Sequence, residues 1–272
     1  MSYDSFQSGV PESAFDNPVD PDRLARHPAL AGVEYHQSID STQLRAHELA
    51  RSAARGAGPL LIVAEEQTAG RGRGANRWWT GRGSLAFSLL LQPGDWQLAS
   101  DPQPGRSLAV GVAIVDTARA LVPARHVGLH WPNDVYVGNK KLAGVLIDVL
   151  QGGQHVIGVG LNVNNGLSGA PDDVRARATS MVELAGRTFD RTEVLSMLIE
   201  NLASALRGLT TDANFGRRFH DMALQIGEQL TINVGGRKST GRCLGIDPDG
   251  ALLLETAMGV ERFHSGTLHG TP

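Results

Sequence analysis

Apolar residues occur along the chain in two patterns, short runs typical of buried strands and a longer segment typical of a helix. Together they predict a domain of mixed α and β structure. The runs LLIVAEE at 60–66 and SLAFSLLL at 84–91 are short, apolar and bounded by turn residues, as in buried strands. Between 106 and 121 the apolar positions extend over a helix-length segment and predict a long helix. The neighbouring runs KLAGVLIDVL and HVIGVGLNVN predict two strands that pair antiparallel.

The same pattern divides the chain into three parts. Residues 1–30 are polar and carry four prolines, which predicts a flexible leader. Residues 31–224 are expected to form the main domain; it opens with a strand at 33–37 and a helix capped by Asp40 or Ser41 and ends with helices near 191–207 and 212–223. Short strands separated by GG, DPDG and MG turns predict a small five-stranded β domain over 225–272.

Composition narrows the classes of function. The 272 residues carry a formal net charge of -3 and no block of basic residues, so we expect no nucleic-acid partner. The single cysteine, Cys243, is expected to be a small buried residue, and no Cys/His cluster has zinc-site spacing. No apolar run reaches 18 residues and no secretion signal opens the chain, so we expect a cytoplasmic protein without a membrane partner.

The loop QTAGRGRGANRWW at 67–79 is the first candidate for chemistry. It alternates three glycines with two arginines: Gly70, Arg71, Gly72, Arg73 and Gly74. The glycines can take positive φ and approach a ligand closely, and the guanidiniums can bind a carboxylate or a phosphate; solvated arginines on an exposed loop are the alternative. The loop matches neither GxxxxGK[ST] nor a GxGxxG that opens a helix. Trp78 and Trp79 either pack in the core or stack on a base.

Two further segments carry polar groups at the ends of strands. In HWPNDVYVGNKKLAG at 130–144, a turn presents Asn133 and Asp134, and a hairpin brings Lys141 to the start of an apolar strand. Such a lysine either extends its amine to solvent at the strand end or faces an anion. In GVGLNVN at 158–164, Gly158 and Gly160 allow another element to approach, and Asn162 is either a ligand or an ordinary strand end.

Five segments together resemble the successive motifs of biotin-protein ligases, in family order and spacing: DSTQ at 40–43, EEQTAGRGRGANRWW at 65–79, HWPNDVYV at 130–137, KKLAGVLID at 140–148 and GVGLNVN at 158–164. The resemblance covers about residues 33–268 and is to the short form without a DNA-binding domain. It implies an α+β fold: a mixed sheet with helices packed on one side, similar to the class II aminoacyl-tRNA synthetase catalytic domain, plus a small SH3-like β barrel. Residues 31–224 would then be the catalytic domain.

The resemblance also implies an activity and its residues. Biotin would be activated by ATP, with Mg²⁺, to biotinyl-AMP and passed to one lysine of a biotin carboxyl carrier domain of acetyl-CoA carboxylase type. Lys141, Arg71 and Arg73 would be catalytic: Lys141 would offset charge that develops during adenylation, and the arginines would hold the carboxylate and the adenylate. The biotin-binding residues would be Ser41, Thr42, Gln43, Gln67, Gly70, Arg71, Gly72, Arg73, Lys141 and Gly144.

For ATP, the resemblance implies Arg73, Trp78, Asn133, Asp134 and Asn162, with Asp134 and Asn162 as Mg²⁺ ligands. This chain departs from the family pattern at His130, where the family usually has lysine, and at Gln43, where it usually has asparagine. Two alternatives stand beside this reading. A lipoate or octanoyl ligase shares the fold, but its RRxSGGGxVxHD motif is absent; a non-catalytic biotin sensor would not need Lys141.

Overall fold

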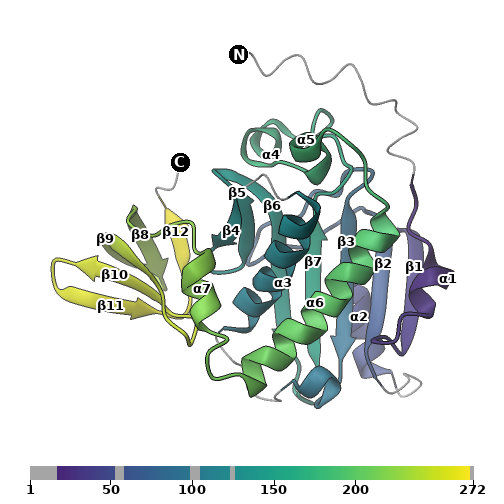
Figure 1. Cartoon of the computed structure of the whole chain (residues 1–272), viewed down its shortest axis with the longest axis horizontal. Helices are drawn as coiled ribbons and strands as arrows, with labels where there is room; N and C mark the ends of the chain where they lie inside the picture. The colour runs from purple at the N-terminus through teal and green to yellow at the C-terminus, as the bar shows by residue number, and fades with distance from the viewer. Residues whose placement is uncertain (1–16, 53–57, 99–104, 123–125, 270–272) are drawn as a thin grey trace.

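A seven-stranded mixed sheet forms the centre of the molecule (Figure 1). The computed structural model describes residues 17–52, 58–98, 105–122 and 126–269. The strand order is β1-β2-β3-β7-β6-β5-β4; β1 and β2 pair parallel, and the other neighbours pair antiparallel. The strands are β1 (Gly32–Ile39), β2 (Leu60–Gln67), β3 (Leu85–Leu91), β4 (Val127–His130), β5 (Asp134–Val137), β6 (Lys140–Val149) and β7 (His155–Leu161).

Two long helices cover one face of this sheet, and a third helix covers the other. α3 (Arg106–Leu121), which has the predicted bounds, and α6 (Arg191–Thr211) enclose the main core (Figure 1). α2 (Thr42–Arg51) packs Ala46 against a separate cluster on the opposite face: Ile62, Leu90 and Val156. The prediction of helices on one side is therefore wrong. β3 is buried at every position, so both of its faces need a covering layer.

The predicted leader is also ordered in part. α1 (Pro21–Ala25) begins after Asp20, whose side chain accepts a hydrogen bond from the Arg23 amide, and Leu24 is completely buried in the main core. The prediction of a flexible leader is wrong for residues 17–30, because Val19 and Leu24 supply apolar side chains that the polar composition of the segment conceals. Residues 1–16 lie outside the described residues.

Arg191 joins this segment to the rest of the molecule. The side chain is 2% exposed, and its guanidinium donates to the Asn17 carbonyl at 2.7 Å, the Ser84 carbonyl at 2.8 Å and the Glu65 carboxylate at 2.5 Å. Glu65 also accepts the Val19 amide at 2.8 Å. A buried charge is tolerated only when it is paired and hydrogen-bonded, as it is here. Arg191 is the first residue of α6, so residues on both sides of the 67–83 segment, Glu65 and Ser84, are hydrogen-bonded to that helix.

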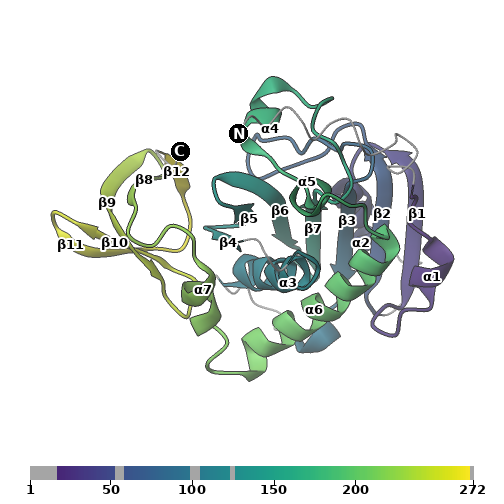
Figure 2. The same cartoon turned by 45° about the horizontal axis from the view of Figure 1, so that its top comes forward.

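The C-terminal part is a separate antiparallel sheet of five strands, as the sequence predicts (Figure 2). Its order is β11-β10-β9-β8-β12, and its strands are β8 (Gln229–Val234), β9 (Arg237–Ile246), β10 (Leu252–Thr256), β11 (Gly259–Phe263) and β12 (Thr267–His269). The shorter helices are α4 (Asp172–Arg177), α5 (Met181–Ala185), α7 (Arg217–Met222) and the 3₁₀ turn η3 (Asp95–Gln97). Cys243 is 1% exposed, which confirms its predicted burial. Across the described ranges, every helix is too short or too polar to cross a membrane.

His155 opens β7 as a buried titratable group. It pairs with Leu91 and Val149 in the sheet and is fully buried. Burial, with a smaller contribution from Arg106, lowers the pKa of His155 to about 4. The unfolded chain, in which the ring titrates near 6.5, therefore binds a proton that the folded protein excludes between these two pH values.

We predict that His155→Leu removes a loss of stability on the acid side. Wild-type unfolding free energy should fall by on the order of 2 kcal/mol between pH 8 and pH 5 through this group alone, because stability is lost as pH drops below the unfolded pKa. Urea unfolding of wild type and variant at both pH values measures the difference. Ile157→Val, in the same strand, should lower stability equally at both. An unchanged pH slope in His155→Leu would refute the assignment.

Candidate active site

A row of small side chains crosses the sheet on the α2 face, just beyond the start of that helix. Cross-strand pairing places Ala64 beside Ala86, Ala86 beside Gly160, Gly160 beside Gly144, and Gly144 beside Asp134. Alternate residues of a strand share one face, so these positions form a continuous floor across five strands. With no side chain larger than methyl until Asp134, the floor leaves room for a flat or extended group against the backbone.

Trp78 lies on this floor. A Cβ atom added at Gly160 would be 2.1 Å from the indole Cε2, and one added at Gly144 would be 3.3 Å from Cζ3. The indole nitrogen is buried without a hydrogen-bond partner. Trp79 packs instead on Gly81, where an added Cβ would lie 2.4 Å from the ring. Both tryptophans pack within the protein, and Gly160 allows the close approach predicted from GVGLNVN.

The glycine and arginine loop folds into a hairpin that places Trp78 on the floor. The Trp78 amide donates to the Gly70 carbonyl at 3.0 Å, and the Gly72 amide donates to the Asn76 carbonyl at 2.9 Å. Only Gly74 takes positive φ, at 65°, so that expectation is wrong for Gly70 and Gly72. Gly70 is needed for close approach: an added Cβ would lie 2.5 Å from the Trp78 carbonyl oxygen. Arg71 is exposed on this hairpin.

Lys141 reaches the floor because the register of β6 shifts. Asp134 pairs with Gly144 and Val135 with Ala143, but Tyr136 pairs with Lys141. Leu142 is the extra residue; it and Ala143 are both buried in the main core, so Lys141 shares the face of Gly144. Its amine lies 2.8 Å from Asp134 Oδ1 and 5.7 Å from the Trp78 ring centroid. The Lys141 amine thus faces an anionic group, the Asp134 carboxylate, and does not extend to solvent at the strand end.

The beginning of α2 supplies hydrogen-bonding groups beside this floor. Ser41 is the N-cap residue, is fully buried, and its Oγ has no hydrogen-bond partner. The Thr42 amide donates to Gln67 Oε1 at 2.9 Å, at the end of β2. That contact turns the Gln67 amide nitrogen outward, where Thr80 Oγ1 lies 3.4 Å away. Ser41, Thr42 and Gln67, predicted to share one task, therefore lie together.

Other predicted residues lie elsewhere. Gln43 points away from the floor, toward Asp148 and the Val156 carbonyl. Asn162 is 4% exposed, and its amide is already used: Nδ2 donates to the Thr179 carbonyl at 2.9 Å and Oδ1 accepts from Asn165 at 3.0 Å. Each end of the Asn162 amide thus has one partner within the protein, as a buried amide requires.

Arg73 and Asn133 line a hollow of about 260 Å³, separate from the floor, which Arg106 and His264 also line. Arg73 Nη1 donates to the Gly266 carbonyl at 2.7 Å, so the loop contacts the C-terminal domain. The Asn133 side chain donates to the Val145 carbonyl at 2.7 Å. The residues predicted to bind ATP thus separate into Trp78 with Asp134, Arg73 with Asn133, and Asn162 by itself.

His130, which stands where the family usually has lysine, is stacked on Tyr136 with ring centroids 4.3 Å apart. Burial lowers the pKa of His130 and raises the pKa of Tyr136 to about 12. His130 therefore carries no charge at neutral pH, and Lys141 is the lysine that faces the floor.

Sequence reasoning missed three contributors to this region: Ser88, Ala64 and Ala86. Ser88 is a fully buried polar residue within β3, and its isolation in the run LAFSLLL was the available signal. The two alanines carried no signal, because only the pairing register reveals the row. In the described ranges no three His, Cys, Asp or Glu residues are grouped to hold a metal ion.

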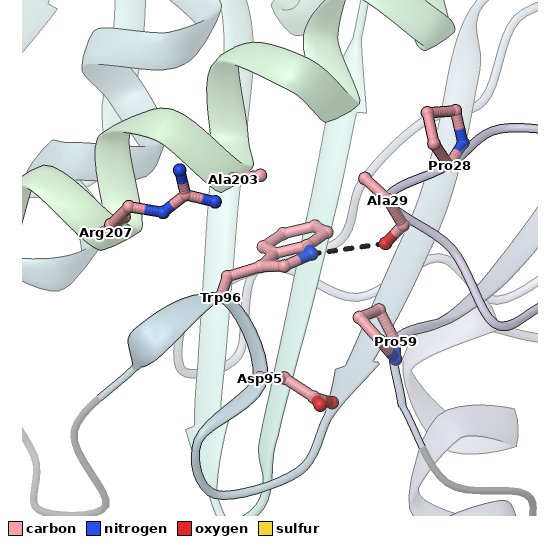
Figure 3. A pocket seen from close by; sticks show the side chains of 7 residues that line it. All are labelled: Pro28, Ala29, Pro59, Asp95, Trp96, Ala203 and Arg207. Carbon is pink, nitrogen blue, oxygen red and sulfur yellow. Dashed lines mark hydrogen bonds between the residues drawn. The ribbon is translucent and has the colours of Figure 1, made fainter.

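A hollow of about 430 Å³ lies away from these residues, between α6 and the start of β2 (Figure 3). Trp96, Pro28 and Pro59 form its apolar walls, with Asp95 and Arg207 at its edges. The Trp96 indole nitrogen already donates to the Ala29 carbonyl at 3.2 Å. This hollow is larger than the one beside Arg73, but among the described residues that line it only Asp95 and Arg207 are charged. The floor beside Lys141, where an ion pair and several hydrogen-bonding side chains lie together, is therefore the candidate site.

Comparison with known proteins identifies the family. Residues 35–164 match the Biotin/lipoate A/B protein ligase family, and residues 226–267 match the Biotin protein ligase C terminal domain. The bifunctional ligase/repressor BirA of Bacillus subtilis is 33% identical over 241 residues, covering 86% of this chain and 72% of its own. The biotin--[acetyl-CoA-carboxylase] ligase of Paracoccus denitrificans is 32% identical, covering 81% of this chain and 92% of its own.

A solved structure is also similar. The Aquifex aeolicus biotin protein ligase in complex with biotin and ATP has a TM-score of 0.76 and 28% identity, and the match covers 88% of this chain and 98% of that one.

Proposed function

The chain belongs to the Biotin/lipoate A/B protein ligase family, and on that premise we propose that it is an ATP-dependent biotin protein ligase. It would form biotinyl-AMP and transfer the biotin to a lysine of a biotin carboxyl carrier domain of acetyl-CoA carboxylase. The observation that carries the proposal is the floor of Ala64, Ala86, Gly160 and Gly144, bounded by the Lys141–Asp134 ion pair.

Each part of biotin has a matching surface in this proposal. Ser41 Oγ, Thr42 Oγ1 and Gln67 Nε2 would bind the neutral ureido ring, which needs fixed donors and acceptors. The valeryl chain would lie on Gly160 and Gly144. The Trp78 indole occupies that position, with Cε2 2.1 Å from an added Gly160 Cβ. The indole must therefore move when the valeryl chain of biotin binds. Gly70 and Gly72 would form the loop that closes over the ligand.

The chemistry follows from charge. The biotin carboxylate would attack the α-phosphorus of ATP, and pyrophosphate would leave as the α–β bond breaks. Lys141 would offset the negative charge that concentrates there, while Asp134 holds its amine 2.8 Å away until substrate binds. The neutral amine of the carrier lysine would then attack the acyl carbon and release AMP. Arg71 would bind the carboxylate, and Arg73 would help retain the adenylate.

Mg²⁺ would enter with ATP. Asn162 Oδ1 already accepts a hydrogen bond from Asn165, so it would offer Mg²⁺ only its second lone pair. Asp134 fits as a single carboxylate ligand, and Mg²⁺ is commonly held by one or two carboxylates together with substrate phosphates. The ion would neutralise phosphate charge when bound. Arg73 and Asn133, which line the hollow beside the C-terminal domain, would contact the nucleotide there.

Two finer expectations belong to this proposal. The main domain would share the class II aminoacyl-tRNA synthetase architecture and the C-terminal sheet the SH3-like one, and the site of action would be the cytoplasm. Lipoate ligation is the nearest alternative, because the matching family includes lipoate ligases. The relatives named as biotin ligases favour biotin. A sensor without catalysis would leave the Lys141–Asp134 pair unexplained.

The test of function is direct. A biotin carboxyl carrier domain incubated with the protein, ATP and Mg²⁺ should gain the mass of biotin on one lysine, as peptide mass spectrometry would show. Lipoate in place of biotin should give no product. Lipoylation without biotinylation would favour the alternative ligase, and biotin binding without pyrophosphate release would favour the sensor.

We predict that Lys141→Ala lowers the single-turnover rate of pyrophosphate release by roughly 10²-fold or more, while biotin affinity falls by less than about tenfold. The reason is that its charge matters most as the transition state forms. Stopped-flow detection of pyrophosphate and calorimetry with biotin measure the two quantities. Lys140→Ala, the adjacent lysine, is the matched control and should change neither. Equal losses in rate and affinity would contradict the assigned role.

A further inference from the structure

Gln43 was expected to touch biotin, but it belongs to a chain of hydrogen bonds beneath α2. Its Nε2 donates to Asp148 Oδ2 at 2.9 Å and to the Val156 carbonyl at 3.3 Å. The side chain crosses β7 at Gly158, where an added Cβ would be 2.4 Å from Gln43 Oε1. Gln43 is 4% exposed, so each of its polar atoms needs a partner within the protein.

These contacts fix which end of the amide faces Ser88. Asp148 and the Val156 carbonyl are both acceptors, so only the nitrogen can face them, and Oε1 must face the other way. There it accepts from Ser88 Oγ at 3.2 Å. Asp148 is itself held by His47, whose Nε2 lies 2.8 Å from Oδ2.

The next link sets the polarity of Thr42. Its Oγ1 lies 2.9 Å from Ser88 Oγ and 3.2 Å from Gln67 Oε1, and its single hydroxyl proton can serve only one of them. Gln67 Oε1 also receives the Thr42 amide at 2.9 Å. Ser88 has given its own proton to Gln43, so the 2.9 Å contact between the two hydroxyl groups needs the Thr42 proton. Thr42 therefore donates to Ser88, and neither Ser88 nor Gln67 donates to Thr42 Oγ1.

We propose that Gln43, acting through Ser88, holds Thr42 Oγ1 as a hydrogen-bond acceptor for a ureido N–H of biotin. Gln43 is thus a positioning residue for recognition of the ring, although it does not touch the ligand. The inference rests on the proposed function, which places the ureido ring at Thr42. Without an acceptor at position 43, the Ser88 proton turns to Thr42 and occupies one of the two lone pairs of its Oγ1, which weakens Thr42 as an acceptor for the ligand.

The direction of the hydrogen bonds from Thr42 through Ser88 to Gln43 predicts that a second substitution can reverse the effect of the first. Gln43→Leu should raise KM for biotin about threefold to tenfold, the effect of weakening one hydrogen bond, with kcat and KM for ATP within about twofold. Ser88→Ala removes the proton that would compete for Thr42 when position 43 lacks an acceptor. Adding Ser88→Ala to Gln43→Leu should restore KM, although the second change removes further packing and hydrogen bonding.

Steady-state kinetics on the full chain, with thermal melts of each variant, provide the test. Asn201→Leu is the matched control: its amide donates to Thr117 at 2.8 Å between α6 and α3 on the opposite face, and its loss should move no KM. Gln43→Met replaces Gln43→Leu if the latter does not fold. A double variant worse than Gln43→Leu, or KM values that follow the melting temperature, would show a purely structural role and overturn the proposal. A wild-type protein without biotin ligation would instead contradict the proposed function.

Discussion

The arrangement of this site depends on a row of the sheet that carries almost no side chains. Where Ala64, Ala86, Gly160 and Gly144 meet across four strands, the backbone surface is bare enough for an indole to lie against it. Any Cβ at Gly160 would overlap Trp78, so the indole could not keep this position on the row. The hydrogen-bonding groups at the start of α2 and the Lys141–Asp134 pair surround the row, so one constraint on side-chain size positions all of them.

Local pattern predicts much of this architecture. The bounds of α3 and the succession of strands along the chain follow from apolar runs. The loop that packs on the floor stands out in the sequence because glycines and arginines alternate next to two tryptophans. Information that arises only from long-range packing is not available locally. The position of α2 on the second face, the burial of Leu24 and the cross-strand row each depend on residues distant in sequence. The side-chain direction of Lys141 depends on a register shift at Leu142.

Polar residues near the site illustrate the same limit. Gln43 and Asn162 both fit the sequence pattern of ligand-binding residues, yet each is at most 4% exposed and satisfies its hydrogen bonds inside the protein. Ser41 differs, because its buried Oγ has no partner. A buried polar atom without a partner is costly unless a ligand supplies one. An unpartnered atom of this kind is visible only in coordinates.

The central claim is that biotin takes the place of the Trp78 indole on the glycine floor. Fluorine NMR of protein labelled with 5-fluorotryptophan tests it most directly, with the Trp78 resonance assigned through Trp78→Phe. Saturation with biotin should shift that resonance strongly, while Trp131, buried and bonded to the Gly250 carbonyl, serves as an internal reference and should stay in place. A Trp78 resonance that does not move at saturating biotin would show that the floor remains covered, and that biotin binds elsewhere.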